Sequence, residues 1–94
     1  MLIQTPPVQY VFINTAGTVV CKTEPGRLVR IVFTASNTCT CVVYDGNPAT
    51  GQIISSISLA GGDKQVGQFE YACSFLQSLT IVTTGTPTLT VVFE

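Results

Sequence analysis

Hydrophobic and polar residues alternate along most of the chain, and turn-forming residues interrupt this alternation about every ten residues. Val, Ile and Thr dominate the alternating segments, and their branched side chains favour strands over helices. Gly, Pro, Asn and Asp cluster in the interruptions, where turns need them. The pattern therefore predicts seven β-strands, at residues 18–23, 27–35, 38–44, 52–59, 67–73, 79–84 and 89–93, and a shorter eighth strand at 10–13.

Short strands at regular spacing are typical of a sandwich or a barrel. We therefore expect an all-β chain forming a single β-sandwich of seven to eight antiparallel strands, with a jelly-roll and an immunoglobulin-like topology both open. The sequence contains no Trp, so the immunoglobulin signature is missing. Residues 1–9 are expected to form an extended N-terminal arm, because Pro6-Pro7 cannot join the interior of a ladder, and residues 10–94 the sandwich domain.

The same alternation predicts which side chains line the core. Successive residues of a strand point to opposite faces, so every second residue of a strand shares one side. Counted in this way, the expected core residues are Val29, Ile31, Phe33, Ile53, Ile57, Phe69, Tyr71, Ile81, Leu89, Val91 and Phe93.

Composition adds a reason to expect partners. The 94 residues are 46% hydrophobic and only 10% charged, whereas ordinary domains carry about 25% charged residues. The low charge predicts that other subunits cover much of the surface, and hence a homo-oligomer. A net charge of −1 provides no basic footprint for nucleic acid or anionic lipid. No apolar run is long enough to span a membrane, and residues 1–7 lack the features of a signal peptide.

Candidate catalytic groups are few. The chain has no His, which removes the commonest general base and metal ligand. Its acids are scattered over predicted loops and strand ends, and only a chance arrangement would hold Asp45 and Glu70 the roughly 5–9.5 Å apart that a glycosidase needs. Gly61-Gly62 is interpreted as a hairpin tip, because no helix or Lys-Ser/Thr pair follows it as in a phosphate-binding loop. We therefore expect no enzymatic activity and no cofactor.

The four cysteines are Cys21, Cys39, Cys41 and Cys73. Cys39 and Cys41 would face the same side of one strand with parallel side chains, which suits a disulfide poorly. A four-cysteine zinc site is the alternative, but its usual ligands are pairs of Cys spaced C-x₂-C on loops. We expect four reduced thiols that act as small apolar residues, and no metal.

Two groups of residues are candidates for a protein interface. The arm offers apolar side chains on a stiff Pro-Pro segment, namely Leu2, Ile3, Pro6, Pro7 and Val8. Arg27 and Arg30 flank an apolar run, where they would pair with a partner's carboxylates or, as charges on an edge strand, block aggregation. Exposed tyrosines at positions 10, 44 and 71 are the alternative, since such rings would favour a carbohydrate module.

A loose pattern of strands and turns covers residues 26–94. Its residues are Gly26-Arg27-Leu28, Val42-Val43-Tyr44-Asp45-Gly46, Thr50-Gly51, Gly67-Gln68-Phe69-Glu70-Tyr71, Phe75, and the segments 79–87 and 89–93. In this pattern the chain resembles a group of short β-rich structural proteins of tailed bacteriophages. Ser78 stands where the group often has Gly, so that turn is expected to differ, and the cysteines are peculiar to this sequence.

The resemblance implies a non-enzymatic virion structural protein. Its leading role would be that of a capsid decoration, or cement, protein on the capsid exterior, assembled in the bacterial host cytoplasm. The implied partner is the major capsid protein, bound at junctions between its subunits, and the implied oligomer is a trimer, with a dimer second. The alternative is a tail or head-fibre recognition module that binds a host glycan or receptor.

Overall fold

The computed structural model describes residues 8–34, 38–48, 51–59 and 67–94, and every regular element in them is a strand. The eight strands are β1 (Gln9–Ile13), β2 (Gly17–Lys22), β3 (Gly26–Phe33), β4 (Cys39–Asp45), β5 (Gln52–Leu59), β6 (Gly67–Phe75), β7 (Leu79–Gly85) and β8 (Leu89–Phe93). The prediction of an all-β sandwich is thus confirmed, with strand ends within two residues of those expected. Within these residues, no helix is long and apolar enough to cross a bilayer.

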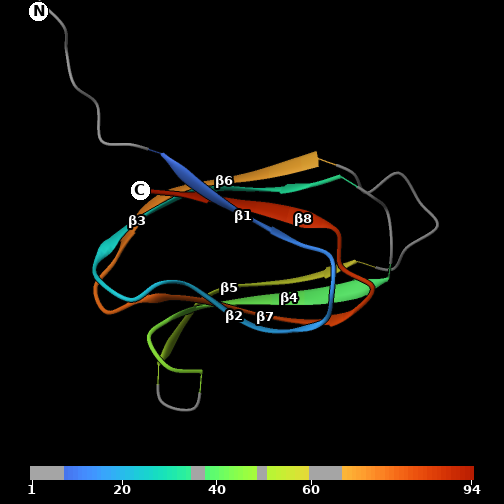
Figure 1. Cartoon of the computed structure of the whole chain (residues 1–94), viewed down its shortest axis with the longest axis horizontal. Coiled ribbons are helices and arrows are strands. Elements are labelled where there is room, and N and C mark those ends of the chain that lie inside the picture. The colour runs from blue at the N-terminus through green and yellow to red at the C-terminus, as the bar shows by residue number, and fades with distance from the viewer. Residues whose placement is uncertain (1–7, 35–37, 49–50, 60–66) are drawn as a thin grey trace, which may run out of the picture.

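The strands form two four-stranded sheets that lie one above the other (Figure 1). Sheet A has the order β1-β8-β3-β6 and sheet B the order β2-β7-β4-β5, with every pair antiparallel. The first strand therefore pairs with the last, the second with the seventh, the third with the sixth and the fourth with the fifth. This nested order is that of an eight-stranded jelly roll, which decides between the two topologies that the sequence left open.

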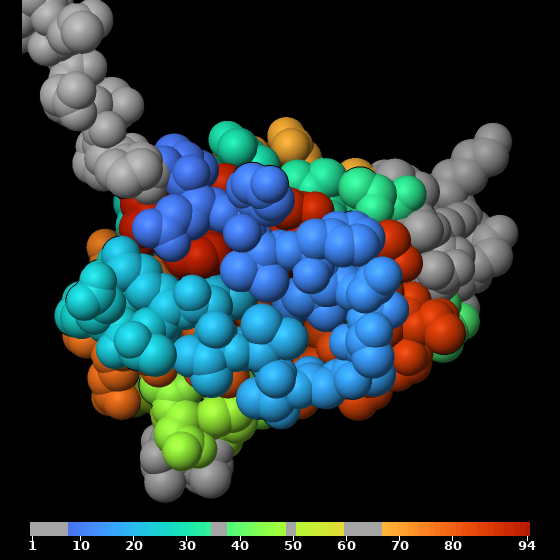
Figure 2. Space-filling model, in the orientation of Figure 1, coloured from blue at the N-terminus to red at the C-terminus, as the bar shows by residue number. Residues whose placement is uncertain are grey.

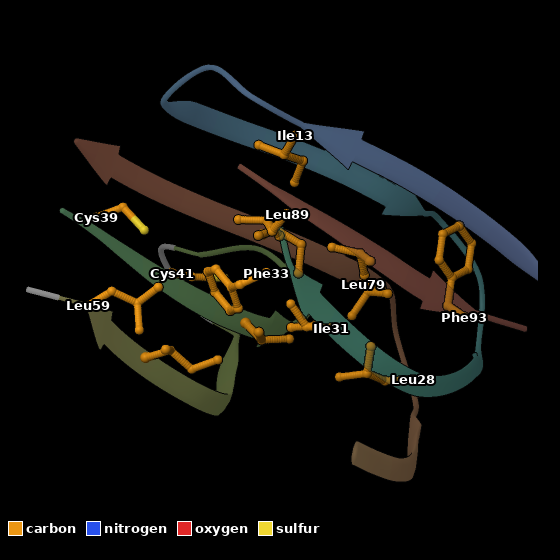
Figure 3. Packing of buried hydrophobic residues seen from close by; sticks show 14 of the residues in the cluster. Ile13, Leu28, Ile31, Phe33, Cys39, Cys41, Leu59, Leu79, Leu89 and Phe93 are labelled. Atoms are coloured by element: carbon orange, nitrogen blue, oxygen red, sulfur yellow. The ribbon is translucent and has the colours of Figure 1, made fainter. Parts of the chain in front are cut away.

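The core lies between the two sheets (Figure 3) and is almost entirely aliphatic, aromatic or cysteine. Seven of the predicted core residues are buried there: Ile31, Phe33, Ile57, Ile81, Leu89, Val91 and Phe93. The sequence pattern did not place Leu28, Phe75 and Leu79 in the core, yet all are at most 1% exposed. Because Leu28 and Ile31 are three residues apart and both point inward, strand β3 cannot follow a strict two-residue alternation.

β-bulges explain the errors in the predicted core. Relative to β8, strand β3 contains one extra residue at Val29, which leaves that side chain only half-buried. In β5 the extra residue is Ile54, which packs against the core, whereas Ile53 turns outward and is 60% exposed. An inserted residue reverses the face to which the following side chains point, so a count along the sequence fails beyond it.

The other two residues wrongly predicted to be fully buried, Phe69 and Tyr71, lie on β6, an edge strand of sheet A. Phe69 is 40% exposed and packs edge to face against Phe33, with ring centroids 5.7 Å apart. Tyr71 is half-buried, and its hydroxyl donates a hydrogen bond to Ser55 Oγ on β5 at 2.7 Å. These side chains point toward the core but close its open side, which explains their partial exposure.

Candidate interaction surfaces

Both candidate arginines lie on the outer face of sheet A. Arg30 pairs through Nε with Glu70 Oε1 at 2.7 Å, and Arg27 Nη1 lies 3.9 Å from Glu94 Oε1. Strand β3 lies between β8 and β6, so the interpretation of these arginines as edge-strand charges is wrong. Each guanidinium already pairs with a carboxylate of its own chain, so it is less available to bind a carboxylate of a partner. Exposed ion pairs of this kind contribute about 0–1 kcal/mol to the stability of the fold.

The described part of the arm continues into an apolar stripe on β1. Val8 is 55% exposed, Tyr10 73% and Phe12 53%, and Tyr10 and Phe12 point away from the core. The register sets Tyr10 beside Val92 and Phe12 beside Thr90 on the outer face of sheet A. The other arm candidates, Leu2, Ile3, Pro6 and Pro7, lie outside the described residues, as do residues 35–37, 49–50 and 60–66, which include the expected Gly61-Gly62 tip.

A second surface is the outer face of sheet B, which sequence reasoning did not single out. Two rows of side chains cross all four strands: Val20, Thr80, Tyr44 and Ile53; and Thr18, Val82, Val42 and Ser56. A third row crosses β7, β4 and β5 and consists of Thr84, Thr40 and Ser58. None of these residues is charged, and a hydrogen bond joins the Thr40 and Thr84 hydroxyls. Val20 and Ile53 are 54% and 60% exposed.

The signal for this second surface was present in the sequence. Both faces of these strands carry Val, Ile, Thr or Ser, so the sequence pattern does not mark either face as the one exposed to solvent. Only the pairing of strands distant in sequence showed that these residues gather on one face.

The two carboxylates considered as a glycosidase pair lie in different sheets. Asp45, at the end of β4, accepts hydrogen bonds from the backbone N–H of Leu76 at 2.9 Å and of Gln77 at 2.8 Å. These bonds, led by that from Leu76, lower the pKa of the Asp45 carboxyl below its usual range. Glu70 instead pairs with Arg30 on the outer face of sheet A. Asp45 therefore holds the connection between β6 and β7 in place.

All four cysteines are free thiols, and Cys39 and Cys41 are buried on the same face of β4, as expected. Burial raises the pKa of Cys21 to about 11. The pKa of Cys41 rises to about 12, first because of burial and then because of the neighbouring Cys39 and Cys21. Among the described residues, no three His, Cys, Asp or Glu side chains gather as metal ligands. The thiols of Cys21 and Cys41 thus stay protonated at neutral pH and pack as apolar groups.

Comparison with models of protein families finds no family that matches this sequence, and the search of curated proteins finds no match either. The class that the structure defines is a single jelly-roll domain with two exposed surfaces that are poor in charge.

Proposed function

We propose that this protein is a virion structural protein that decorates the outside of an icosahedral bacteriophage shell and cements neighbouring major capsid subunits. The observation that carries the proposal is the uncharged outer face of sheet B. In a sheet with one face in water, each strand normally alternates apolar residues on the core side with polar and charged residues on the solvent side. Here Val20, Tyr44 and Ile53 occupy the outer side instead, which suits a surface that another protein covers.

Stabilisation of the shell needs no catalytic group. A ligand that binds assembled subunits and not separated ones shifts the equilibrium toward assembly by mass action. A rigid sandwich that spans a junction between subunits has this property, because its contact area exists only when both subunits are present. The resemblance of residues 26–94 to small structural proteins of tailed phages supports the same role.

The size of the face indicates that it does not act alone. Four strands about 4.8 Å apart, with outer side chains in rows about 6.8 Å apart, make a patch of roughly 400 Å². A stable interface usually buries about 800 Å² on each partner. Further contact from the arm, Leu2 to Val8, and from the joining of several copies would supply the difference through avidity. Pro6-Pro7 restricts the arm, which reduces the entropy lost when it docks.

The test uses empty shells built from the major capsid protein of the same virus. Ile53→Glu places a charge on the proposed contact face and should weaken cosedimentation with shells by about tenfold or more, as expected for a buried, unpaired charge. The matched control is Leu76→Glu, at a position in the β6–β7 connection that is 76% exposed, and it should bind like the wild type. Deletion of Met1–Val8 should weaken binding while leaving the fold intact.

Particles without the protein should break at lower temperature or in milder osmotic shock. If Ile53→Glu and the arm deletion both decorate shells with full affinity, neither surface contacts the shell and the proposal fails. If depleted particles are as robust as complete ones and fail only to adsorb to cells, the fibre interpretation holds instead. In that case the exposed ring of Tyr10 becomes the first residue to test for glycan binding.

A further inference from the structure

The four edges of the two sheets differ in how well they are protected against pairing. Strands β1 and β6 flank sheet A, and β2 and β5 flank sheet B. Three of these edges are interrupted by a bulge: β2 at Cys21, β5 at Ile54, and β6 around Ala72, whose φ is +49°. Bulges bend an edge and disturb its hydrogen-bonding groups, which hinders addition of another strand.

Strand β1 has none of these protections. It pairs with β8 over five consecutive residues without a register shift, and among the described residues β8 is its only partner strand. The sequence from Val8 to Cys21 contains no charged residue. Figure 2 views this side of the molecule, on which β1 lies above β2 and both face the viewer. A regular, uncharged edge with exposed aromatic side chains is a template for pairing with another strand.

We propose that β1 pairs antiparallel with β1 of a second copy of this chain across a two-fold axis at Val11. Two four-stranded A sheets then join into one sheet of eight strands. Around such an axis, Tyr10 lies opposite Phe12 of the second copy and Gln9 opposite its Ile13. The outer face then gains two cross-strand aromatic pairs, and Val11 and Ile13 keep their inward orientation in both copies.

A second copy fits this edge better than an unrelated partner because of the charge pattern. In a two-fold interface, the residues near the axis contact the same short segment of the second copy, so a charged residue there tends to face a residue of like charge. The stretch 8–21 avoids that conflict completely, whereas an edge built for a different protein gains specificity from complementary charges. The nearest charged pair in the same row, Arg30 with Glu70, is neutralised within one chain. The proposed oligomer is therefore a dimer, in place of the trimer that the resemblance implies.

The test is sedimentation of the purified full chain over a dilution series, in the absence of shells, with two designed double variants. Tyr10→Glu with Phe12→Glu places two glutamates opposite each other in both rows and should raise the dimer dissociation constant by about 100-fold. Tyr10→Lys with Phe12→Glu places opposite charges in the same two rows and should restore most of the affinity. Ile53→Glu, at the far edge of sheet B, should leave the dimer unchanged. Circular dichroism checks that each variant folds.

Recovery by the second variant is specific to this register, because only pairing centred on Val11 sets position 10 against position 12. Equal loss in both double variants would overturn the proposal, as would a wild type that sediments as a monomer or a trimer at micromolar concentration. A dimer that disappears when residues 1–7 are deleted would also overturn it, since the arm rather than β1 would then make the contact. None of these results depends on shell binding, so the dimer and the decoration role fail independently.

Discussion

The contact between Phe33 and Phe69 allows a quantitative test of the core. Phe33 is fully buried in β3, whereas Phe69 is 40% exposed on the edge strand β6. Phe33→Ala should lower the free energy of unfolding by about 3–5 kcal/mol, because it leaves a cavity between the sheets. Phe69→Ala removes only the buried part, about 60%, of a side chain whose full burial contributes about 1.5–3 kcal/mol, so it should cost about 1–2 kcal/mol.

The pair should also be coupled. Their edge-to-face geometry, with the ring planes 82° apart, contributes about 0.5–1.5 kcal/mol beyond burial, so the double variant should cost less than the two single variants together. The free energy of unfolding of a domain of this size is roughly 5–14 kcal/mol, so Phe33→Ala should remove a large share of it. Urea unfolding at equilibrium gives each value from the midpoint and slope.

The control for this cycle is Phe33→Ala combined with Val20→Ala, on the outer face of sheet B, which should be additive. Equal costs for the two phenylalanines, or additivity within about 0.3 kcal/mol for the contacting pair, would refute the reasoning.

Three further predictions concern single groups. Asp45→Asn should lower the free energy of unfolding by about 1–2 kcal/mol at neutral pH. Because folding lowers the pKa of this carboxyl, its stabilisation is complete above the ordinary pKa of about 3.9 and is lost as the pH falls through the folded-state pKa. The urea midpoints of the wild type and the variant should therefore converge in acid. Cys41 should alkylate at least about 1,000-fold more slowly in the native protein than an exposed thiol, since its pKa rises from 9.0 to about 12; fast labelling would contradict its burial. Gly85→Ala should destabilise the fold by more than about 1 kcal/mol, because φ is +80° and the new Cβ would meet the Thr38 carbonyl oxygen; an unchanged melting temperature would disprove this.

The sequence was sufficient to predict the strands but not all of their faces. Alternation of Val, Ile and Thr marked each strand, because that local pattern reflects burial of one side of a strand. Val29 and Ile53 were wrongly assigned because a bulge depends on pairing with a strand far along the chain. The αL conformation of Ala72 has no local signal at all, since Ala rarely adopts a positive φ.

The interaction surfaces were predictable only in part. The low overall charge predicts surfaces that other subunits cover, and this stays a prediction, as does the interface role of Val8, which is 55% exposed. Arg27 and Arg30 looked available in the sequence because their partners, Glu94 and Glu70, are far away along the chain. The uncharged face of sheet B becomes visible only when β2, β7, β4 and β5 are set side by side.

The nesting of strands also fixes where attached segments leave the domain. Because Gln9 lies opposite Phe93, chain entering β1 and chain leaving β8 pass through one corner of sheet A. A peptide fused after Glu94 would emerge beside the point at which the chain enters β1. The opposite end of the sandwich, where β1 turns into β2 and β7 into β8, lies a full strand length away (Figure 1). A peptide that must stay clear of the corner where both ends of the chain meet sheet A is therefore better inserted at that far end than appended to either terminus.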